Sequence, residues 1–353
     1  MLKYSIKRII LAFITAFIIL SLTFLLVKSL QFETGTFGGN EAAKHAYFLK
    51  QLNLNYVDVY DDPNIVNILG DPLAWFEIKT EAGKTTYEYY YAKPLLEQYG
   101  NWLGNVFTKW DWGVSTSIDL NQPATSIILS RLPTSMYINI ASVIVSVPLG
   151  IALGILAGLK KNTWIDHLIS TLVMIFISIP SFVVISFLIY FLCYKAQVLP
   201  SMWPLPSASF RTKLLAYIIP VMALSFGSIC GYTRFVRAEL CEVMSSEYLL
   251  LARTKGLTKN QAIKRHALKN AFVPILPSIL AEFIGIFGGS MILEKLYGIP
   301  GIGDLYIRSI NEKDYNVLMV DMAIFTTVGL LAGIVLDLSY GFIDPRIRMG
   351  EKR

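Results

Sequence analysis

The sequence predicts an all-α integral membrane protein with six transmembrane helices and a small extracellular insertion of mixed α/β structure between the first two. Hydrophobic residues make up 54% of its 353 residues and charged residues only 16%, whereas soluble domains carry about 25% charged residues. Six stretches also reach the roughly 20 apolar residues that a bilayer core requires. The basic residues gather in alternate connecting segments, as they do in multi-pass membrane proteins.

The six apolar stretches are long and almost free of charged residues. They cover residues 9–27, 132–159, 168–194, 214–233, 271–293 and 317–340. The first stretch is too long for the core of a signal peptide and no cleavage site of small residues follows it, so we expect it to be retained. The third carries Pro180 near its middle, which membrane helices tolerate better than soluble ones do.

The positions of the basic residues predict the orientation in the membrane. With the N-terminus inside, the cytoplasmic segments hold 17 of the 31 Lys and Arg residues. Residues 31–122 hold twelve acidic and six basic residues, a net charge of −6, which suits the outer side. We therefore expect both termini in the cytoplasm and the protein in the plasma (inner) membrane.

Residues 31–122 are too many for a bare loop and predict a small folded domain. Asn40 is expected to cap a helix that ends near residue 53. Residues 75–80 and 85–91 predict a hairpin, and Pro94 fits the first turn of a further helix. Apolar residues recur on one face of that helix, which predicts core packing, with docking of an extracellular partner as the alternative. They are Leu95, Leu96, Tyr99, Trp102, Leu103, Val106 and Phe107.

Small residues at positions 150, 154 and 158 form a GxxxGxxxG pattern within the second apolar stretch. Gly150, Gly154 and Gly158 would let two helix backbones approach closely in lipid. The partner helix belongs either to this chain or to another subunit, and the spacing does not choose between them.

The longest cytoplasmic segment predicts two short helices joined by a tight corner. Ser245 or Ser246 is expected to cap the first helix, and Glu247 suits its first turn. Gly256 stands where a helix ends in the left-handed conformation, with Leu257 as the hydrophobic residue that often follows such an end.

The second helix of this segment begins with a predicted capping box. Thr258 would cap it, and Gln261 lies three residues further on. The corner exposes Tyr248 and several leucines, which suits a groove on another protein. An amphipathic helix lying on lipid headgroups explains the same residues equally well.

The segment resembles the EAA loop of ABC-importer permeases, in the form typical of dipeptide and oligopeptide permeases. The matching residues are Glu247, Tyr248, Ala252, Arg253, Lys255, Gly256, Leu257, His266, Leu268, Asn270 and Pro274. Leu250 and Leu251 replace the first two letters of the general Glu-Ala-Ala triplet, while the glycine keeps its position.

The resemblance extends over the first apolar stretch and about residues 110–348. It includes residues 110–115, 131–134 and 294–303, and Asp337 together with residues 344–348. The Trp-Asp-Trp-Gly element at residues 110–113 and the short N-terminal tail are typical of the B-type subunit. Asn316 stands where the family usually has proline.

The resemblance implies a type I ABC-importer permease fold and an ATP-driven importer of peptides. Residues 1–30 would then be the N-terminal transmembrane helix, 31–122 the extracellular domain, and 123–353 a core of five transmembrane helices with its coupling loop at 244–270. The implied ATPase-coupling residues are Glu247, Tyr248, Ala252, Arg253, Lys255, Gly256, Leu257, His266 and Asn270. Chelated nickel or another small solute is the alternative substrate.

The implied partners are a second homologous permease subunit, two cytoplasmic ABC ATPase subunits, an extracellular peptide-binding protein or lipoprotein, and membrane lipid. Nucleic acid is not expected, because the net charge of +6 is explained by membrane topology. ATP and Mg²⁺ would bind to the partner subunits. The chain itself is expected to hold no cofactor and no catalytic residue.

Ionisable residues within the apolar stretches are functional candidates, because they are costly in lipid. Glu282 and Asp321 are expected to line the translocation path or to bind a substrate amine. We expect Asp337 to pair with Arg234 or Arg237. The rival class is a proton- or ion-coupled secondary carrier that uses Glu282 and Asp321.

Neither a metal site nor an ATP site is expected in the chain. His45, His167 and His266 show no ligand spacing to a cysteine or to one another, and the three cysteines form no CxxC pair. Residues 83–85 resemble the end of a Walker A loop, but Ile78 stands where its first glycine belongs.

Overall fold

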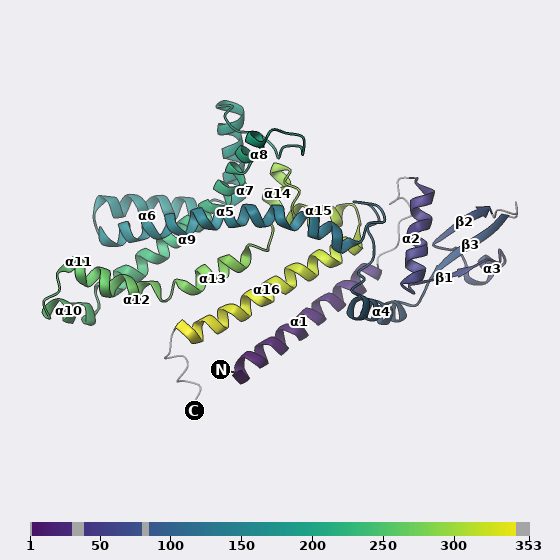
Figure 1. The fold of residues 1–353 in the computed structure, drawn as a ribbon, viewed down its shortest axis with the longest axis horizontal. Coiled ribbons are helices and arrows are strands. Elements are labelled where there is room, and N and C mark those ends of the chain that lie inside the picture. The colour runs from purple at the N-terminus through teal and green to yellow at the C-terminus, as the bar shows by residue number, and fades with distance from the viewer. Residues whose placement is uncertain (1, 30–38, 80–84, 344–353) are drawn as a thin grey trace. The chain divides into compact units, whose positions relative to one another are not determined.

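The computed structural model describes residues 2–29, 39–79 and 85–343, which form two compact units (Figure 1). Each unit is described by itself. The first takes the described residues within Met1–Ala12, Pro133–Asp304 and Val328–Arg353, and the second those within Phe13–Leu132 and Leu305–Thr327. This grouping cuts across the ranges 1–30, 31–122 and 123–353, because several long helices contribute residues to both units.

Helices make up the first unit. Its elements are α6 (Trp164–Ile177), α7 (Ser181–Leu188), the π-helical segment η3 (Ile189–Lys195), α8 (Phe210–Ala216), α9 (Ile218–Met244), α10 (Glu247–Thr254), α11 (Lys259–Ala262), the π-helical segment η4 (Ile263–Ala267), α12 (Leu268–Phe272), α13 (Leu276–Gly285) and α14 (Met291–Tyr297). Four helices contribute to both units: α1 (Leu2–Ser29), α5 (Ala124–Leu159), α15 (Ile302–Asn311) and α16 (Tyr315–Ile343).

Four stretches of the described chain are helical, long and apolar enough to cross a membrane. They are Ser5–Ser29, Ala124–Leu159, Phe210–Met244 and Tyr315–Ser339. Two pairs of helices meet the same criterion only together, namely Trp164–Ile177 with Ser181–Lys195 and Lys259–Phe272 with Leu276–Gly285. The chain is thus mostly helical with four candidate spans, or six if each bent pair is one span.

A proline lies at each of the two bends. The pair α6 and α7 turns by 100° at Pro180, whose backbone is extended (φ −59°, ψ 143°). Proline has no N–H to donate and pushes the preceding residue out of the helical region, so it breaks a helix. The bend of 50° before α13 contains Pro274.

The fifth apolar stretch differs from its expected bounds of 271–293. Helix α13 ends at Gly285, and α14 begins only at Met291. Gly288 and Gly289 lie between them. Glycine is among the weakest helix formers. The apolar stretch therefore continues through Gly288 and Gly289, although the helix is interrupted there.

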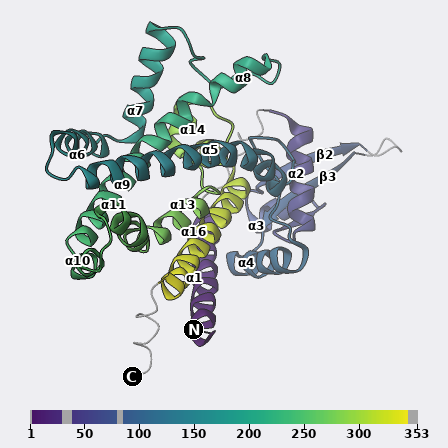
Figure 2. The ribbon, with the colours of Figure 1, turned by 60° about the vertical axis from the view of Figure 1, so that its left-hand side comes forward.

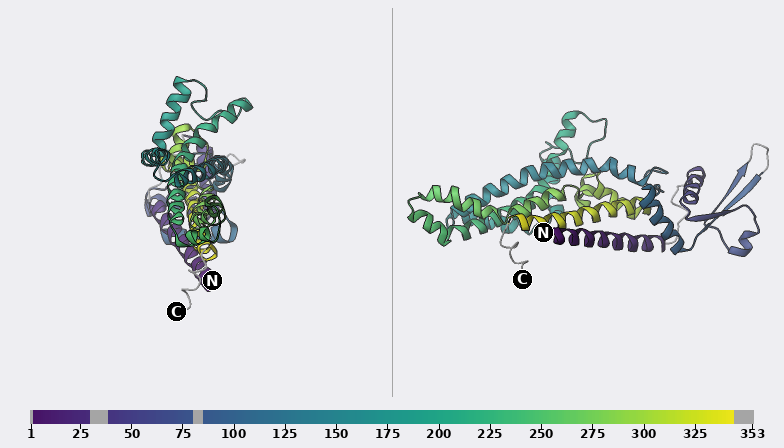
Figure 3. Two further views of the ribbon diagram at one scale, coloured as in Figure 1. Left: turned by 90° about the vertical axis from the view of Figure 1, so that its left-hand side faces the viewer. Right: turned by 60° about the horizontal axis from the view of Figure 1, so that its bottom comes forward.

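The second unit contains a three-stranded antiparallel sheet with helix α2 beside it (Figures 1 and 3). Its elements are α2 (Glu41–Asn53), β1 (Val57–Tyr60), α3 (Ile65–Leu69), β2 (Ala74–Lys79), β3 (Thr85–Ala92), α4 (Leu95–Gly104) and the π-helical segment η2 (Asn105–Lys109). The strand order is β1-β3-β2, with Val57 opposite Ala92 and Ala74 opposite Tyr90. Phe48 from α2 packs with Phe76 and Tyr90 in the core of this domain.

The structure confirms two of the local predictions for this domain. The Asn40 side chain accepts a hydrogen bond from the Ala43 N–H at 3.0 Å and so caps α2. Strands β2 and β3 pair as the predicted hairpin, although residues 80–84, including Gly83 and Lys84, lie outside the described residues. Strand β1 was not predicted.

The predicted apolar stripe of α4 divides between two environments. Trp102 and Val106 are buried, as core packing requires, whereas Leu96 and Phe107 are exposed. The expectation that the whole stripe forms core is therefore wrong. One part of the apolar surface of α4 and η2 packs in the core, and the adjoining part is exposed.

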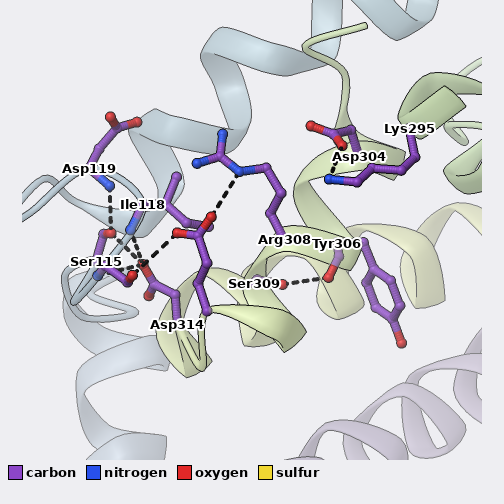
Figure 4. A network of polar contacts seen from close by, with 11 residues as sticks. Ser115, Ile118, Asp119, Lys295, Asp304, Tyr306, Arg308, Ser309 and Asp314 are labelled. Atoms are coloured by element: carbon purple, nitrogen blue, oxygen red, sulfur yellow. Dashed lines mark hydrogen bonds and ion pairs between the residues drawn. The ribbon is translucent and has the colours of Figure 1, made fainter. Parts of the chain in front are cut away.

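A buried carboxylate ties the loop before α5 to the start of α16. Asp314 Oδ2 accepts hydrogen bonds from the backbone N–H groups of Thr116, Ser117 and Ile118 at 3.1–3.2 Å. It also accepts one from the Ser115 hydroxyl (Figure 4). Four donors on one oxygen hold this loop in a single shape.

The asparagine at position 316, where the resembled family usually has proline, has a structural explanation close to Asp314. The Asn316 amide donates to the Val114 carbonyl at 2.8 Å, a bond that a proline side chain cannot make. Gly113 leaves room for it, since a Cβ there would lie 2.8 Å from Asn316 Nδ2. Gly113 also has a positive φ of 91°, which favours glycine.

Candidate functional site

Helix α10 ends in the corner that the sequence predicts. Gly256 has a φ of +94°, in the left-handed region. Its N–H donates to the Arg253 carbonyl at 3.0 Å, and the Leu257 N–H donates to the Ala252 carbonyl at 3.3 Å. These two bonds make a Schellman motif, which satisfies the last carbonyls of the helix and stops it sharply.

The second helix begins with the predicted capping box. The Thr258 hydroxyl accepts from the Gln261 N–H at 3.3 Å, and the Gln261 side chain accepts from the Thr258 N–H at 3.1 Å. Ser246 occupies the N-cap position of α10, but its hydroxyl donates backwards to the Val243 carbonyl instead of accepting from the new helix. The predicted side-chain cap at α10 is therefore wrong, although the boundary is right.

A small hydrophobic core joins the α10–α12 segment (residues 247–272) to the end of α9. Figure 1 shows α10, α11 and α12 next to this end of α9. Leu240 of α9 packs with Leu249 of α10 and with residues of the three following elements. Those residues are Ala262, Ile263, Ala267 and Ala271. The segment is thus a packed body fixed to a long helix.

The residues that the resemblance assigned to coupling lie on the outer surface of this body. Glu247, Tyr248, Arg253, Lys255, Gly256, His266 and Asn270 are exposed, and Ala252 and Leu257 are half-buried. Beside them Leu250 and Leu251 are 62% and 55% exposed. The surface therefore combines apolar side chains with an excess of basic ones.

The three glycines of the GxxxGxxxG pattern lie against α9. A Cβ at Gly150 would lie 2.6 Å from Tyr232 Cβ, and one at Gly154 would lie 2.6 Å from Val236 Cβ. The Thr233 hydroxyl donates to the Gly150 carbonyl at 3.3 Å. The helix that these glycines approach is thus part of the same chain.

The third glycine connects this contact to the α10–α12 segment. A Cβ at Gly158 would lie 3.0 Å from Leu240 Cδ2, and Leu240 belongs to the core of the segment. Helices α5 and α9 and the segment therefore form one continuous packed path.

An ion pair between buried Asp166 and half-buried Arg237 holds α6 to α9. Asp166 is completely buried and accepts from Arg237 Nε at 2.5 Å and from Nη2 at 2.8 Å. Asp337 does pair with an arginine, but the partner is the exposed Arg8 at 3.1 Å and not an interior-facing one such as Arg234 or Arg237, so the expected partners are wrong. Arg237 is instead occupied by Asp166 of α6, a pairing that sequence spacing does not reveal.

Glu282 lies where three helices meet. Ser146 of α5 donates to Glu282 Oε1 at 3.2 Å, and Tyr232 of α9 lies beside the same carboxylate. Glu282 is half-buried. Asp321 belongs to the second unit and is completely buried in α16.

Another buried carboxylate, that of Glu294, organises the loops around α14. Glu294 accepts from the Ser135 hydroxyl at 2.8 Å and from the Asp304 N–H at 3.0 Å. Burial raises the pKa of Glu294, and these donors oppose that rise. A side chain at Gly301 would collide with both Glu294 and Ser135, so this loop requires glycine there.

Sequence relatives identify the group of proteins to which this arrangement belongs. Residues 150–349 match the family described as binding-protein-dependent transport system inner membrane component. The dipeptide transport system permease protein DppB of Lactococcus lactis subsp. cremoris (strain MG1363) is 32% identical over 99% of this chain and 100% of its own length. The chain belongs to this family, as a permease of the dipeptide and oligopeptide type.

Other relatives agree with this placement. The dipeptide permease protein DppB of Bacillus subtilis (strain 168) is 30% identical over 81% of this chain and 90% of its own length. The oligopeptide permease protein OppB of Escherichia coli (strain K12) is 32% identical over 74% of this chain and 83% of its own length. The permease is thus a membrane-embedded subunit of an ABC transporter, and a gradient-driven carrier is not favoured.

The α5–α9 contact gives a stability prediction for the permease. Gly154→Ala places a methyl group against Val236 and the Thr233 carbonyl, so we expect a loss of roughly 1–3 kcal/mol from overpacking. The thermal stability of the purified permease measures it. Gly231→Ala on α9 is the matched control, because a Cβ there meets nothing within 4 Å. Equal stability of the two variants would contradict the contact.

Sequence reasoning missed the partners of the candidate residues in the permease. Ser146 and Tyr232 join Glu282 from other helices, and Arg237 joins Asp166 across 71 residues of chain. No local spacing signals these pairs. The only available signal is the cost of an unpaired charge in lipid, which predicts that a partner exists but not which residue it is.

Proposed function

We propose that the permease is half of the translocation path of an ATP-driven peptide importer. A second homologous permease forms the other half, two cytoplasmic ABC ATPase subunits drive it, and an extracellular binding protein or lipoprotein delivers the peptide. The observation that carries the proposal is the exposed α10–Gly256–α11 corner, in a chain that resembles peptide permeases over its whole length. In this topology the chain has six spans, both termini in the cytoplasm and residues 31–122 outside.

The corner is proposed to seat in a groove on the ATPase subunit. Its apolar residues Tyr248, Leu250 and Leu251 are exposed together, which is costly unless a partner covers them. Six basic residues and a single acidic one, Glu247, lie between positions 247 and 270. An acidic rim on the ATPase groove would complement that charge.

Coupling would run through packed contacts rather than through chemistry on this chain. ATP and Mg²⁺ bind to the ATPase subunits, and closure of those subunits displaces the α10–α12 segment as one body. Leu240 passes the displacement to α9, and the glycine contacts pass it on to α5. Such transmission requires that the spans have two alternative packings. The permease itself contributes no catalytic residue and no cofactor.

Glu282 is proposed to attract the terminal ammonium group of a peptide on the translocation path. It is half-buried and stands beside Ser146 and Tyr232. Asp321 is completely buried here. We propose that it lines the same translocation path only in a conformation in which α16 exposes its side chain. A negative charge within a span is costly in lipid, which supports a functional role for Glu282.

Glu282→Gln is expected to weaken peptide uptake about tenfold or more while the complex still assembles. The reason is the loss of a charge-assisted hydrogen bond, worth roughly 1.5–3 kcal/mol. Initial uptake rates over a range of peptide concentrations measure the effect. A peptide with an acetylated N-terminus is the control and should be transported equally by both proteins. Equal losses for both peptides would refute the ammonium contact.

The choice between peptide and chelated nickel is tested by transport into vesicles. The complete complex is reconstituted in liposomes, and ATP-dependent entry of a labelled dipeptide is compared with entry of a nickel chelate. We expect the peptide alone to accumulate. Accumulation of the chelate without the peptide would replace the substrate assignment and leave the ATPase coupling intact.

A further inference from the structure

Helix α4 and segment η2 carry an exposed apolar stripe beside their buried face. Leu96, Leu103 and Phe107 recur at intervals of seven and four residues, so they lie along one side of the helix, and Trp110 follows as the left-handed residue that ends η2. Leu96 is 78%, Phe107 is 62% and Trp110 is 70% exposed, and Leu103 is half-buried. We name these four residues the α4–η2 stripe.

The buried face of the same helix packs against α1 close to its end. The rings of Phe24 and Trp102 stack with their centroids 4.8 Å apart, and the hydroxyls of Ser21 and Tyr99 lie 2.7 Å apart. Figures 1 and 2 show α4 lying across this end of α1. Helix α4 and the part of α1 that it contacts, from Phe13 onward, both belong to the second unit, so their contact is fixed within one body.

The contact sets the level of α4 relative to a membrane. Residues Ser5–Ser29 of α1 form a candidate span, and Phe24 lies five residues before its end. At 1.5 Å per residue this is roughly 8 Å, about the depth at which the headgroup layer meets the acyl chains. The α4–η2 stripe therefore stands at the boundary of the apolar layer.

We propose that the α4–η2 stripe is a membrane anchor that lies in the lipid interface at the Ser29 end of α1. Leu22 and Leu26, on the face of α1 turned away from α4, are 55% and 69% exposed, so the end of α1 that α4 packs against presents apolar side chains that lipid can cover. Helices with one apolar face bind at this depth through the area that they bury.

The residues around the α4–η2 stripe also suit a lipid surface. Tryptophan is enriched at membrane interfaces because its ring is apolar and its N–H is polar, and Trp110 stands at the end of the stripe. Lys109 is exposed beside it, where it can reach a lipid phosphate. The Lys28 ammonium lies 4.7 Å from the Tyr56 ring at the same end of α1. The anchor would hold the sheet of this domain at a fixed height above the bilayer.

Photo-crosslinking in the assembled transporter tests the anchor. Benzoylphenylalanine replaces Phe107 in one protein and Ile68 of α3 in the other, since Ile68 is also exposed, at 75%, but lies outside the stripe. Both side chains are exposed, so neither replacement disturbs the core. After irradiation in native membranes, mass spectrometry identifies what each probe has captured.

We expect phospholipid adducts at position 107 in several-fold higher yield than at position 68. A protein adduct at position 107 would overturn the anchor and assign the stripe to a partner subunit. Equal lipid yields at the two positions would also overturn it. ATPase-coupled transport does not enter this measurement, so its result is independent of the proposed function.

Discussion

Arg237→Met is expected to prevent accumulation of folded permease in the membrane. Asp166 is completely buried and receives two hydrogen bonds from Arg237, together with bonds from the Asn162 N–H at 2.9 Å and the Ser170 hydroxyl at 3.2 Å. Without the guanidinium the carboxylate keeps its burial but loses its only charged partner among the described contacts. Removing the partner of a buried charge costs roughly 3–5 kcal/mol. Because the Arg237 side chain is 32% exposed, we expect the lower end of that range, which is still a large part of the stability of a typical domain.

The amount of folded permease in membranes, followed by its thermal stability in detergent, measures this loss. Arg234→Met is the matched control, because Arg234 lies one turn earlier on α9 and is exposed. The double change of Arg237→Met with Asp166→Asn should recover much of the stability, since the uncompensated charge is then gone. If Arg237→Met proved as stable as Arg234→Met, the ion pair would not hold α6 to α9.

Gly256→Val is expected to uncouple ATP hydrolysis from transport in a complex that still assembles. The φ of +94° at this position is strained for any residue with a side chain, and most of all for a β-branched one. A Cβ there meets nothing within 4 Å, so the effect is conformational and not steric. The corner should therefore shift by about 1–2 kcal/mol in favour of another shape, which corresponds to about a tenfold loss of the competent form.

Peptide-stimulated ATPase activity of the purified complex measures this uncoupling. Gly256→Asn should retain most of the activity, because asparagine tolerates the left-handed region. Gly227→Val is a second control, since Gly227 lies within α9 without a positive φ and its Cβ direction is open. Normal stimulation in Gly256→Val would contradict the role of the corner geometry.

The sequence predicted most completely those features that neighbouring residues determine. The Schellman motif at Gly256 and the capping box of Thr258 and Gln261 each involve residues within one or two turns, so their chemistry can be read directly from the chain. The Asn40 cap and the β2–β3 hairpin are local in the same sense. The Schellman motif and the capping box together determine the shape of the exposed corner in the α10–α12 segment.

Features that depend on residues far apart in the chain were not predictable in detail. Strand β1 is four residues long and carries little signal of its own, because its pairing with β3 defines it. Hydrophobicity marked the third apolar stretch but not its 100° bend at Pro180. The partners of Asp166 and Glu282 come from other helices, and spans of similar composition offer many alternatives.

The central proposal is that this permease transmits work from separate ATPase subunits through the α10–α12 segment. The most direct measurement is to purify the chain with its native partners, reconstitute the complex in lipid and record ATP hydrolysis with and without peptide. We predict a co-purifying ATPase whose activity rises on addition of peptide and its binding protein, and falls to the basal rate in Gly256→Val. Absence of a co-purifying ATPase, or peptide transport by the chain alone under an ion gradient, would contradict it.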